Sequence, residues 1–367
     1  MAAITTTTSA APARRAARSA TGVRVSSIRD PAGEDAWAAY VHQSAEGTLF
    51  HLPLWCRAVE RAFGHRAAHL MARRGTEVVG VLPLMEVRSW LAGKLLVSVP
   101  YATYGGLLYE DEEARDALAR AAVELVHRSG ARALDLRSQR AAVPAFERDE
   151  RYAGFAKQLP QSPDGLETFL PRKARAAARL AREREHLTVR HDPKHLRLVW
   201  RLYTRSMRRL ASINYPLRFF TALAAELGPR AWVTTVWRGE RPIAGLLSFV
   251  YRDIVLPYFV GVDERVRAPG AMNLIYLAVM ERAVHHGLRR FDFGRSRVSN
   301  RGPYEFKKNQ GFAPRPLGYQ RFVPEGASAP NLSPDNARFR AARRVWPHLP
   351  LAITQRFGAW LAGSIPG

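Results

Sequence analysis

Hydrophobic and polar positions follow the same order in both halves of the chain. The first half opens with "FHLPLWCRAVERAFGHR", which has a proline near its start and a glycine near its end, as helices often do. The stretch "AAHLMARRGTEVVGVLPLMEV" predicts two strands joined by a turn at Gly75, and "KLLVSVPYATYGGLLY" predicts a third strand. A helix follows in "EEARDALARAAVELVHRSG", where apolar residues recur at helical spacing, and "RALDLRS" predicts a closing strand.

The second half repeats this order. The stretch "YPLRFFTALAAELGPR" predicts a proline-led helix that ends at Gly228, and "AWVTTVWRGERPIAGLLSFVYRD" with "IVLPYFVGV" predicts three strands. A helix in "AMNLIYLAVMERAVHHG" and a closing strand in "RRFDFGRS" complete the unit. The spacing from Gly130 to Asp135 equals that from Gly287 to Asp292. The pattern therefore indicates an internal duplication.

Antiparallel strands followed by a helix and a further strand indicate an α+β fold with mixed, largely antiparallel sheets flanked by helices. A chain of 367 residues suits about two domains. We expect a disordered basic tail at 1–22 and a first unit at 23–170. The second unit, with a basic connecting helix, is expected at 171–330, and a helical C-terminal tail at 331–367.

Composition narrows the class of protein. The chain has 47% hydrophobic and 24% charged residues, as soluble globular proteins do, and no apolar run is long enough to cross a bilayer. The first 22 residues lack the apolar region of a secretory signal. The single Cys56 excludes an intramolecular disulfide and a multi-cysteine metal site. These features predict a cytoplasmic protein.

The net charge of +24 comes from 56 Lys and Arg against 32 Asp and Glu. Such an excess favours anionic partners, namely nucleic acid, phosphate-bearing sugars or an anionic membrane surface. The alternative is that an arginine-rich genome spreads arginine over the whole protein. Charge by itself therefore selects no partner.

The order of elements in each half resembles the fold of the Gcn5-related N-acetyltransferases (GNAT). Two such units in tandem resemble the FemA, FemB and FemX aminoacyl transferases, which build peptidoglycan cross-bridges from aminoacyl-tRNA. From about residue 23 the chain looks like the FemAB-related proteins encoded beside bacterial exosortase (PEP-CTERM) and exopolysaccharide systems. The resemblance is carried by "GTLFHLPLWCRAVERAFGHR", "LPRKAR", "VLPYFVGV", "FDFGRS", "YEFKKNQGF" and "NLSPDN".

This resemblance implies an enzyme that transfers an acyl or aminoacyl group to an amine or hydroxyl of a cell-envelope or exopolysaccharide precursor. The expected substrate is a small molecule or a lipid-linked saccharide, met in the cytoplasm or at the inner face of the membrane. No metal and no tightly bound cofactor are expected. Two alternatives stay open: an acyl-CoA-dependent N-acyltransferase of sugar biosynthesis, and a non-catalytic basic module that binds nucleic acid or membrane.

The sequence departs from its relatives at two places that concern the acyl donor. Acetyl-CoA users of this fold bind the pyrophosphate on a glycine-rich loop that leads into a helix N-terminus. The nearest stretch here, "RAPGAM", has Met272 where a small residue is needed. The stretch between the units is also too short for the helical hairpin with which some Fem proteins meet tRNA. The donor is left open between aminoacyl-tRNA and an acyl thioester.

The segment "GPYEFKKNQGF" holds the main catalytic candidates. A lysine cation can stabilise the negative oxygen that forms during acyl transfer. In the Fem transferases a Phe-Lys pair of the second unit has this place, and it matches Phe306 and Lys307. We expect the neighbouring Tyr304 and Lys308 to contact substrate. From the residues alone, the alternative is that the two lysines are solvated loop charges.

Asp292 falls within a strand that would bury it, so it needs a partner, and Arg295 is the nearest. Asp292 is a candidate general base or orienting group, and Arg295 a candidate substrate contact. The alternative is a structural Asp–Arg pair at the strand end, which the matching Asp135 and Arg137 of the first unit favour.

The resemblance adds candidates on the acceptor side. Tyr101 or Tyr104 matches a tyrosine that contacts the sugar-nucleotide acceptor in the Fem transferases, although either could be a packing residue. Arg209 and Tyr215 lie near the position of an arginine that meets acceptor phosphate.

Two basic segments could reach anionic partners. Along one helical face lie Arg172, Arg175 and Arg179. They could bind phosphates of tRNA, a nucleotide sugar or a lipid pyrophosphate, or they could form a solvated helix face. The tail "RFRAARRVWPHLPLAITQRFGAWLAGSIPG" could cap a domain or anchor the protein on an anionic membrane.

Overall fold

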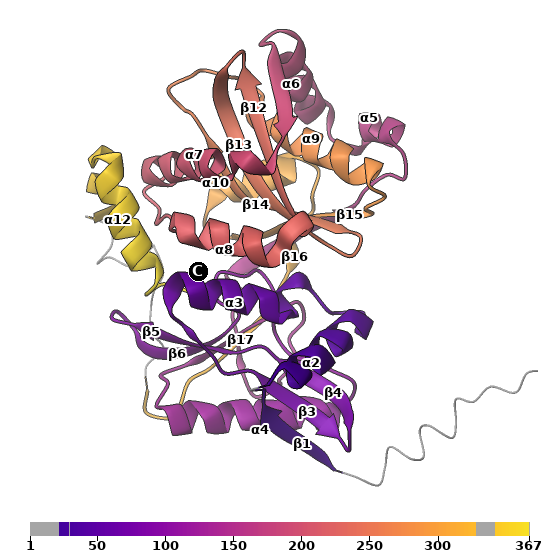
Figure 1. Ribbon diagram of the computed structural model, residues 1–367, viewed down its shortest axis with the longest axis vertical. Coiled ribbons are helices and arrows are strands. Elements are labelled where there is room, and N and C mark those ends of the chain that lie inside the picture. The colour runs from indigo at the N-terminus through magenta and orange to yellow at the C-terminus, as the bar shows by residue number, and fades with distance from the viewer. Residues whose placement is uncertain (1–21, 29, 328–341, 367) are drawn as a thin grey trace, which may run out of the picture.

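The computed structural model describes residues 22–28, 30–327 and 342–366. Apart from Gly22, the predicted basic tail lies outside these residues, and so does 331–341 of the predicted C-terminal tail. The described chain forms two units stacked along the long axis of the molecule (Figure 1). None of the described helices is both long and apolar enough to cross a membrane.

The first unit has two sheets. One joins β1 (Val23–Ser27), β3 (Leu70–Arg74), β4 (Glu77–Leu82) and β7 (Leu108–Tyr109) in that spatial order. The other joins β2 (Arg66–Ala67), β5 (Met85–Ser89), β6 (Gly93–Ser98), β8 (Leu134–Ser138), β17 (Gly318–Phe322) and β9 (Glu147–Arg148). The helices of this unit are α2 (Pro31–Gln43), α3 (Pro53–Phe63) and α4 (Glu112–Ser129).

The second unit is built on one seven-stranded sheet. Its order is β11 (Leu187–His191), β12 (Ala231–Arg238), β13 (Arg241–Tyr251), β14 (Ile254–Val262), β15 (Arg290–Arg297), β10 (Tyr152–Gln158) and β16 (Arg315–Pro316). Its helices are α5 (Leu166–Phe169), α6 (Arg172–Glu183), α7 (Leu196–Arg209), α8 (Leu217–Leu227), α9 (Ala271–His285) and α10 (Arg301–Asn309).

The duplication predicted from the sequence is visible in the strand pairing. Each unit contains one parallel pair that flanks its long helix, β6–β8 around α4 and β14–β15 around α9, and the other pairs are antiparallel. The predicted α+β class, with two similar units and largely antiparallel sheets, is confirmed.

The units differ where one long strand of the second is divided in the first. β13 runs without a break, whereas Pro83 separates β4 from β5 and sends them into different sheets. Proline has no N–H to donate to a strand ladder, which explains the break. The prediction of a single strand over "KLLVSVPYATYGGLLY" in the first unit is also wrong. Two strands form there, β6 and β7, and an irregular segment, 99–107, separates them.

Two strands cross between the units. β10 precedes the predicted boundary at residue 170, yet it pairs with β15 in the seven-stranded sheet of the second unit over Tyr152–Gln158. β17 comes late in the chain, yet it pairs with β8 of the first unit, from Gly318 opposite Ser138 to Phe322 opposite Leu134. Each unit is thus completed by a strand from the other part of the chain. The boundary at 170 stays a prediction, but hydrogen bonding crosses it.

The units also share a hydrophobic core. Helices α3 and α8 lie side by side where the units meet (Figure 1). Trp55 of α3 packs edge-on against Phe219 of α8 and against Phe249 of β13, with ring centroids 6.0 and 5.6 Å apart. At the surface, Glu226 accepts ion pairs from Arg57 and Arg61. This contact fixes the orientation of one unit on the other.

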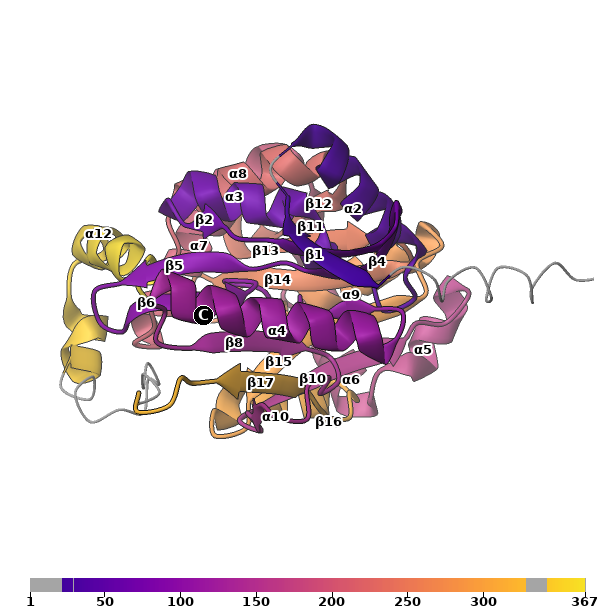
Figure 2. The ribbon, with the colours of Figure 1, turned by 90° about the horizontal axis from the view of Figure 1, so that it is seen from below.

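The C-terminal segment, residues 342–366, lies at the edge of the molecule near the junction of the units (Figure 2). It contains a short 3-10 turn at Trp346–His348 and the helix α12 (Leu351–Ala362). Thr354, Gly358 and Ala362 form the buried face of α12. Gly358 lies so close to Asn214 that an added Cβ would be 2.1 Å from its Oδ1, so glycine permits this packing.

Candidate active site

A cavity of about 680 Å³ lies at the junction of the two units. Its walls come from β8 and β17 of the six-stranded sheet in the first unit, from the end of β15, and from the loop after α7. The C-terminal segment supplies the remaining wall through Trp346, Leu361, Ile365 and Pro366. Because the exchanged strand β17 and the start of β10 both reach it, the cavity exists only when the two units are assembled.

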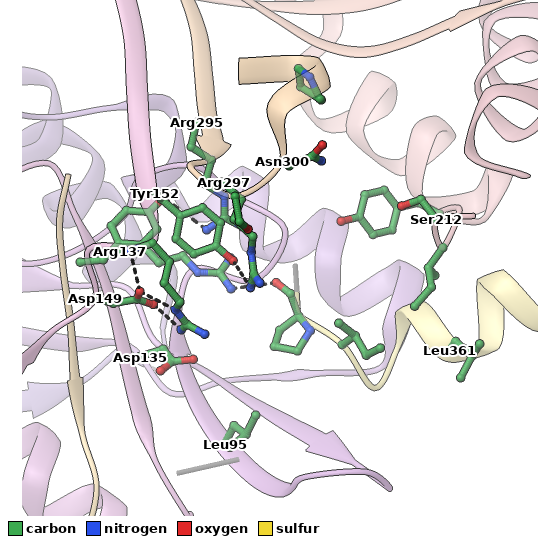
Figure 3. Close-up of a pocket in the computed structure, with 18 of the residues that line it drawn as sticks. Leu95, Asp135, Arg137, Asp149, Tyr152, Ser212, Arg295, Arg297, Asn300 and Leu361 are labelled. Carbon is green, nitrogen blue, oxygen red and sulfur yellow. Dashed lines mark hydrogen bonds and ion pairs between the residues drawn. The ribbon is translucent and has the colours of Figure 1, made fainter. Parts of the chain in front are cut away.

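Arginine dominates the polar lining of this cavity. The described lining contains six arginines and two aspartates: Arg137, Arg151, Arg295, Arg297, Arg321 and Arg343, with Asp135 and Asp149 (Figure 3). Arg321 Nε lies 2.5 Å from Asp135 Oδ1, and Arg151 Nε lies 2.6 Å from Asp149 Oδ1. Among the described lining residues, arginines therefore outnumber aspartates, and both aspartates are already held by arginines.

Arg137 is fixed in the cavity wall by backbone carbonyls. It is only 4% exposed, and its guanidinium donates to the oxygens of Val99 at 2.9 Å, Ala102 at 3.3 Å and Pro366 at 3.0 Å. Burial, and next the charge of Arg295, lower the pKa of Arg137. Crowding of cations at one place is typical of a site that receives an anion.

Arg295 projects from the end of β15 between two tyrosine rings. Its guanidinium carbon lies 4.6 Å from the ring centre of Tyr152 and 5.5 Å from that of Tyr319, and Nη1 donates to the Tyr319 hydroxyl at 3.3 Å. Within the described part of the chain, Arg295 forms no ion pair. Planar stacking leaves the edge of the guanidinium available for two parallel hydrogen bonds to a phosphate or carboxylate.

Tyr152 lies in the positive field of the cavity arginines. Burial acts to raise the pKa of Tyr152, yet the charges of Arg295 and Arg297 outweigh it and lower the pKa below its ordinary value. Arg297 Nη2 also donates to the Tyr152 hydroxyl at 3.3 Å. The cavity therefore combines flat aromatic walls with cations, a combination suited to a ligand that has both a ring and a phosphate.

Lys307 lies behind this wall and does not line the cavity. It belongs to α10, so the segment that could have been a loop is helical. Its Nζ donates to the backbone oxygens of Phe293 and Arg295, both at 2.8 Å, and lies 5.3 Å from the ring centre of Phe155. Burial lowers the pKa of Lys307 to about 7. The ammonium is thus a buried support of β15, next to the residue that enters the cavity.

Asp292 does not pair with Arg295. Its carboxylate is buried and accepts hydrogen bonds from the Tyr104 hydroxyl at 3.0 and 3.2 Å and from Gly294 N at 2.8 Å. Burial raises its pKa. Gly294 has a left-handed backbone, φ 65°, in a strand whose register shifts beside it, and this changes the direction of the side chains that follow. The pairing considered for Asp292 and Arg295, and for Asp135 and Arg137, is therefore wrong.

The other predicted residues separate into two groups. Tyr215 and Arg295 line the cavity. Tyr101 and Tyr104 are buried between the units, where the Tyr101 hydroxyl donates to the oxygen of Ala362 at 2.8 Å. Neither tyrosine reaches the cavity, because loop 99–107 fills the junction under β14 and β15.

The remaining candidates lie on the outside of the second unit. Lys308 pairs with Glu305 and Arg209 with Glu264. Tyr304 packs edge-on against Phe155, and the ring of Phe306 lies tilted against that of Tyr276. Arg172, Arg175 and Arg179 belong to α6, which the structure places at the far end of the second unit (Figure 1). None of these residues lines the cavity.

Sequence reasoning missed most of the cavity. Arg297, Tyr152, Tyr319 and Arg321 were not singled out, although "GRSR" does place Arg295 and Arg297 on one face of a strand. Tyr152 and Tyr319 reach the site only through the exchanged strands, for which the sequence has no signal.

The N-terminus of α9 is covered. In CoA-dependent relatives the corresponding helix start would receive a pyrophosphate. Here Gly270, the N-cap of α9, packs on α6 so closely that an added Cβ would lie 2.0 Å from the oxygen of Ala177. The first turn of α9 therefore faces a helix rather than an open anion site. The described residues also contain no group of acidic, histidine or cysteine side chains suited to a metal ion.

Comparison with known proteins supports this reading of the fold. Residues 170–308 match the family described as acetyltransferase (GNAT) domain. The crystal structure of FemX is similar at 15% identity and a TM-score of 0.62, covering 82% of this chain and 97% of that one. No curated protein matches the sequence.

Two further structures are similar over most of their length. L-PGS from Bacillus licheniformis is 13% identical, with a TM-score of 0.52, and the match covers 87% of this chain and 97% of that one. A tandem GNAT protein from the clavulanic acid biosynthesis pathway is 14% identical, with a TM-score of 0.50, covering 84% and 100%. The tandem GNAT-like fold is thus confirmed, and the match of residues 170–308 to an acetyltransferase (GNAT) domain supports an acyltransferase.

Proposed function

We propose that this acyltransferase modifies a phosphate-bearing saccharide, a precursor of the cell envelope or of an exopolysaccharide, by adding an acyl or aminoacyl group to an amine or hydroxyl. The observation that carries the proposal is the arginine-lined, tyrosine-walled cavity between the units. The saccharide class and the link to exosortase systems rest on the sequence resemblance. We expect the reaction on the cytoplasmic side of the membrane.

The cavity residues divide the work of binding. Arg295 and Arg297 extend from adjacent outward positions of β15 and would hold a phosphate through charge-assisted hydrogen bonds. Arg137, fixed by three carbonyls, would add charge without moving. Tyr152, Tyr215 and Tyr319 would pack on a sugar or base and exclude water, which strengthens the electrostatic attraction.

For Lys307 we propose a positioning role, at one remove from the reacting atoms. Its two hydrogen bonds to β15 join α10 to the backbone of Arg295. The role first expected for Lys307 and Phe306, direct stabilisation of the negative oxygen, stays a prediction. The ammonium has three N–H groups, and the two hydrogen bonds to β15 use only two of them. Loss of a positioning role would weaken substrate binding, whereas loss of direct stabilisation would lower turnover.

For the donor we propose an aminoacyl group rather than an acyl thioester, because α6 covers the helix start that would receive the CoA pyrophosphate. The match to an acetyltransferase domain favours the thioester as the second candidate. Incubation of the protein with aminoacyl-tRNA, or with acyl-CoA, and a mixture of nucleotide sugars distinguishes them. We expect tRNA discharge and an acylated sugar by mass spectrometry; CoA release would favour the thioester. Salt-sensitive RNA binding without any transfer would instead support a non-catalytic module.

Binding of inorganic pyrophosphate, measured by calorimetry, tests the cavity itself. Arg295→Met should weaken binding about tenfold to a hundredfold, which corresponds to the ~1.5–3 kcal/mol of a hydrogen bond to a charged group. Arg179→Met, an equal change on α6, is the matched control and should bind as the unaltered protein does. If Arg179→Met weakens binding and Arg295→Met does not, the phosphate site lies on α6 instead of in the cavity.

A further inference from the structure

The C-terminal segment exposes an apolar stripe that nothing in the described protein covers. On α12, Ile353, Phe357 and Trp360 follow one another at helical spacing and are 40%, 57% and 58% exposed. The packed face of the same helix, Thr354, Gly358 and Ala362, points elsewhere. The stripe of small residues packs on the rest of the protein. The second stripe, of large apolar residues, is suited to contact a separate partner.

The stripe continues onto the first unit. Trp90, in the turn between β5 and β6, is 59% exposed, and its ring is stacked on that of Trp360 with centroids 5.1 Å apart. We call Trp90, Ile353, Phe357 and Trp360 the aromatic patch. These four are half of the eight large hydrophobic residues exposed on the described chain, so the exposure is concentrated at one place. Figure 2 shows α12 projecting at this edge of the molecule, beside β5 and β6.

The surroundings of the aromatic patch are basic. Arg356 is exposed on α12 next to the stripe, and Arg343 and Arg344 are exposed just before it in the chain. Residues 342–366 contain no aspartate or glutamate. Tryptophan and phenylalanine beside arginine, without acids, are the composition of helices that lie in the interface of an anionic bilayer. An acidic protein surface would pair with the arginines but would have no use for four exposed apolar side chains.

The patch also adjoins the cavity. Leu361, which follows Trp360, lines the cavity, and so do Arg343 and Trp346 of the same segment. A surface that holds α12 would therefore lie at the rim of the cavity.

We propose that the aromatic patch and the arginines around it dock the protein on an anionic phospholipid bilayer, with the cavity rim at the level of the head groups. Docking requires only the patch. Its benefit for catalysis, access to a lipid-linked phosphate, rests on the proposed function. Trp90 and Trp360 would insert at the interface, and the arginines would neutralise lipid phosphates.

Sedimentation of the full-length protein with vesicles tests docking without any substrate. We expect binding to phosphatidylcholine vesicles containing about one third phosphatidylglycerol, weak binding to phosphatidylcholine alone, and loss of binding at high salt. Trp90→Ser combined with Trp360→Ser should lower the partition coefficient at least tenfold. Arg356→Glu should lower it on the anionic vesicles.

Two control variants make the same kinds of substitution outside the aromatic patch. Tyr109→Ser removes a ring that is 37% exposed outside the patch, and Arg120→Glu reverses an exposed charge on α4. Both should bind as the unaltered protein does. If the protein ignores anionic vesicles, or if the double serine variant binds them unchanged, the proposal is overturned. A second outcome also overturns the proposal: the protein does not bind vesicles but forms a dimer through the stacked tryptophans. Sedimentation equilibrium would then show a dimer that the double variant dissociates. Pyrophosphate binding by these variants is expected to be normal, which separates this proposal from the function of the cavity.

Discussion

At the scale of single residues, the cavity depends on how β15 ends. Arg295 enters the cavity because Gly294 takes a left-handed conformation, and Asp292 is turned the other way to Tyr104. Lys307 then binds the two carbonyls on either side of Gly294. Gly294 thus separates a buried acid from a cation that faces the cavity, and Lys307 of α10 binds the backbone on both sides of it.

The positioning role of Lys307 is tested by comparing binding with turnover. Lys307→Met should weaken pyrophosphate binding severalfold, because the backbone that carries Arg295 loses two hydrogen bonds. Calorimetry measures this, and steady-state transfer should show KM rising more than kcat falls. Lys308→Met, which removes an exposed neighbour, should change neither. A loss confined to kcat, with binding intact, would favour direct stabilisation of the negative oxygen instead.

The same substitution predicts a change in pH dependence. Burial lowers the pKa of Lys307 to about 7, whereas the unfolded chain has an ordinary lysine pKa near 10.5. Between these values the unfolded state binds the extra proton, so stability from this group grows as pH rises and is lost as pH falls toward 7. Relative to Lys307→Met, the unaltered protein should gain free energy of unfolding between pH 7 and pH 9 in urea titrations. A slope difference of opposite sign would exclude a depressed pKa for Lys307.

At the scale of elements, the contact between α6 and α9 decides how the second unit differs from a CoA-binding one. The sequence predicted α6 correctly as a basic helix, and its arginine face, expected to be either a phosphate site or a solvated face, stays exposed at Arg172 and Arg179. In the structure its alanines, Ala174, Ala178 and Ala181, are buried, and Ala177 meets Gly270 at the start of α9. Small residues allow the helix to approach the backbone of α9 closely, and this closes the anion site.

Two glycines at the ends of α9 make a matched test of that contact. Gly270 and Gly287 both have left-handed backbones, φ 78° and 70°, but only Gly270 has α6 against it. Gly287→Ala should cost about 1–2 kcal/mol of unfolding free energy from backbone strain alone. Gly270→Ala should cost roughly 1–3 kcal/mol more, because a methyl group cannot fit against Ala177. Urea denaturation measures both, and equal losses would mean that α6 moves away readily.

At the scale of the whole molecule, the exchange of β10 and β17 makes one cooperative body of two similar units. Each strand completes the sheet of the other half, and a common aromatic core lies between them. The cavity is lined by both units, so its shape depends on their assembly.

This linkage predicts that the units do not fold alone. Residues 23–170 lack β17 and residues 171–330 lack β10, so each fragment leaves an unpaired strand edge and exposed core. Expressed separately, both should be aggregated or unfolded by circular dichroism. The full chain should unfold in a single calorimetric transition whose enthalpy agrees with the van't Hoff value. Two separate transitions, or a folded fragment, would show that the exchanged strands are dispensable.

The sequence by itself determined the duplicated α+β order, the helix ends at prolines and glycines, and the basic character of the chain. These follow from local periodicity and from backbone chemistry, which act over a few residues. Tertiary structure alone decided that β10 and β17 change units, that Gly294 directs Arg295 and Asp292 apart, and that six arginines line one cavity. Those outcomes depend on contacts between residues far apart in the chain, where a hydrogen-bonded strand edge has many candidate partners and only the packed fold selects one.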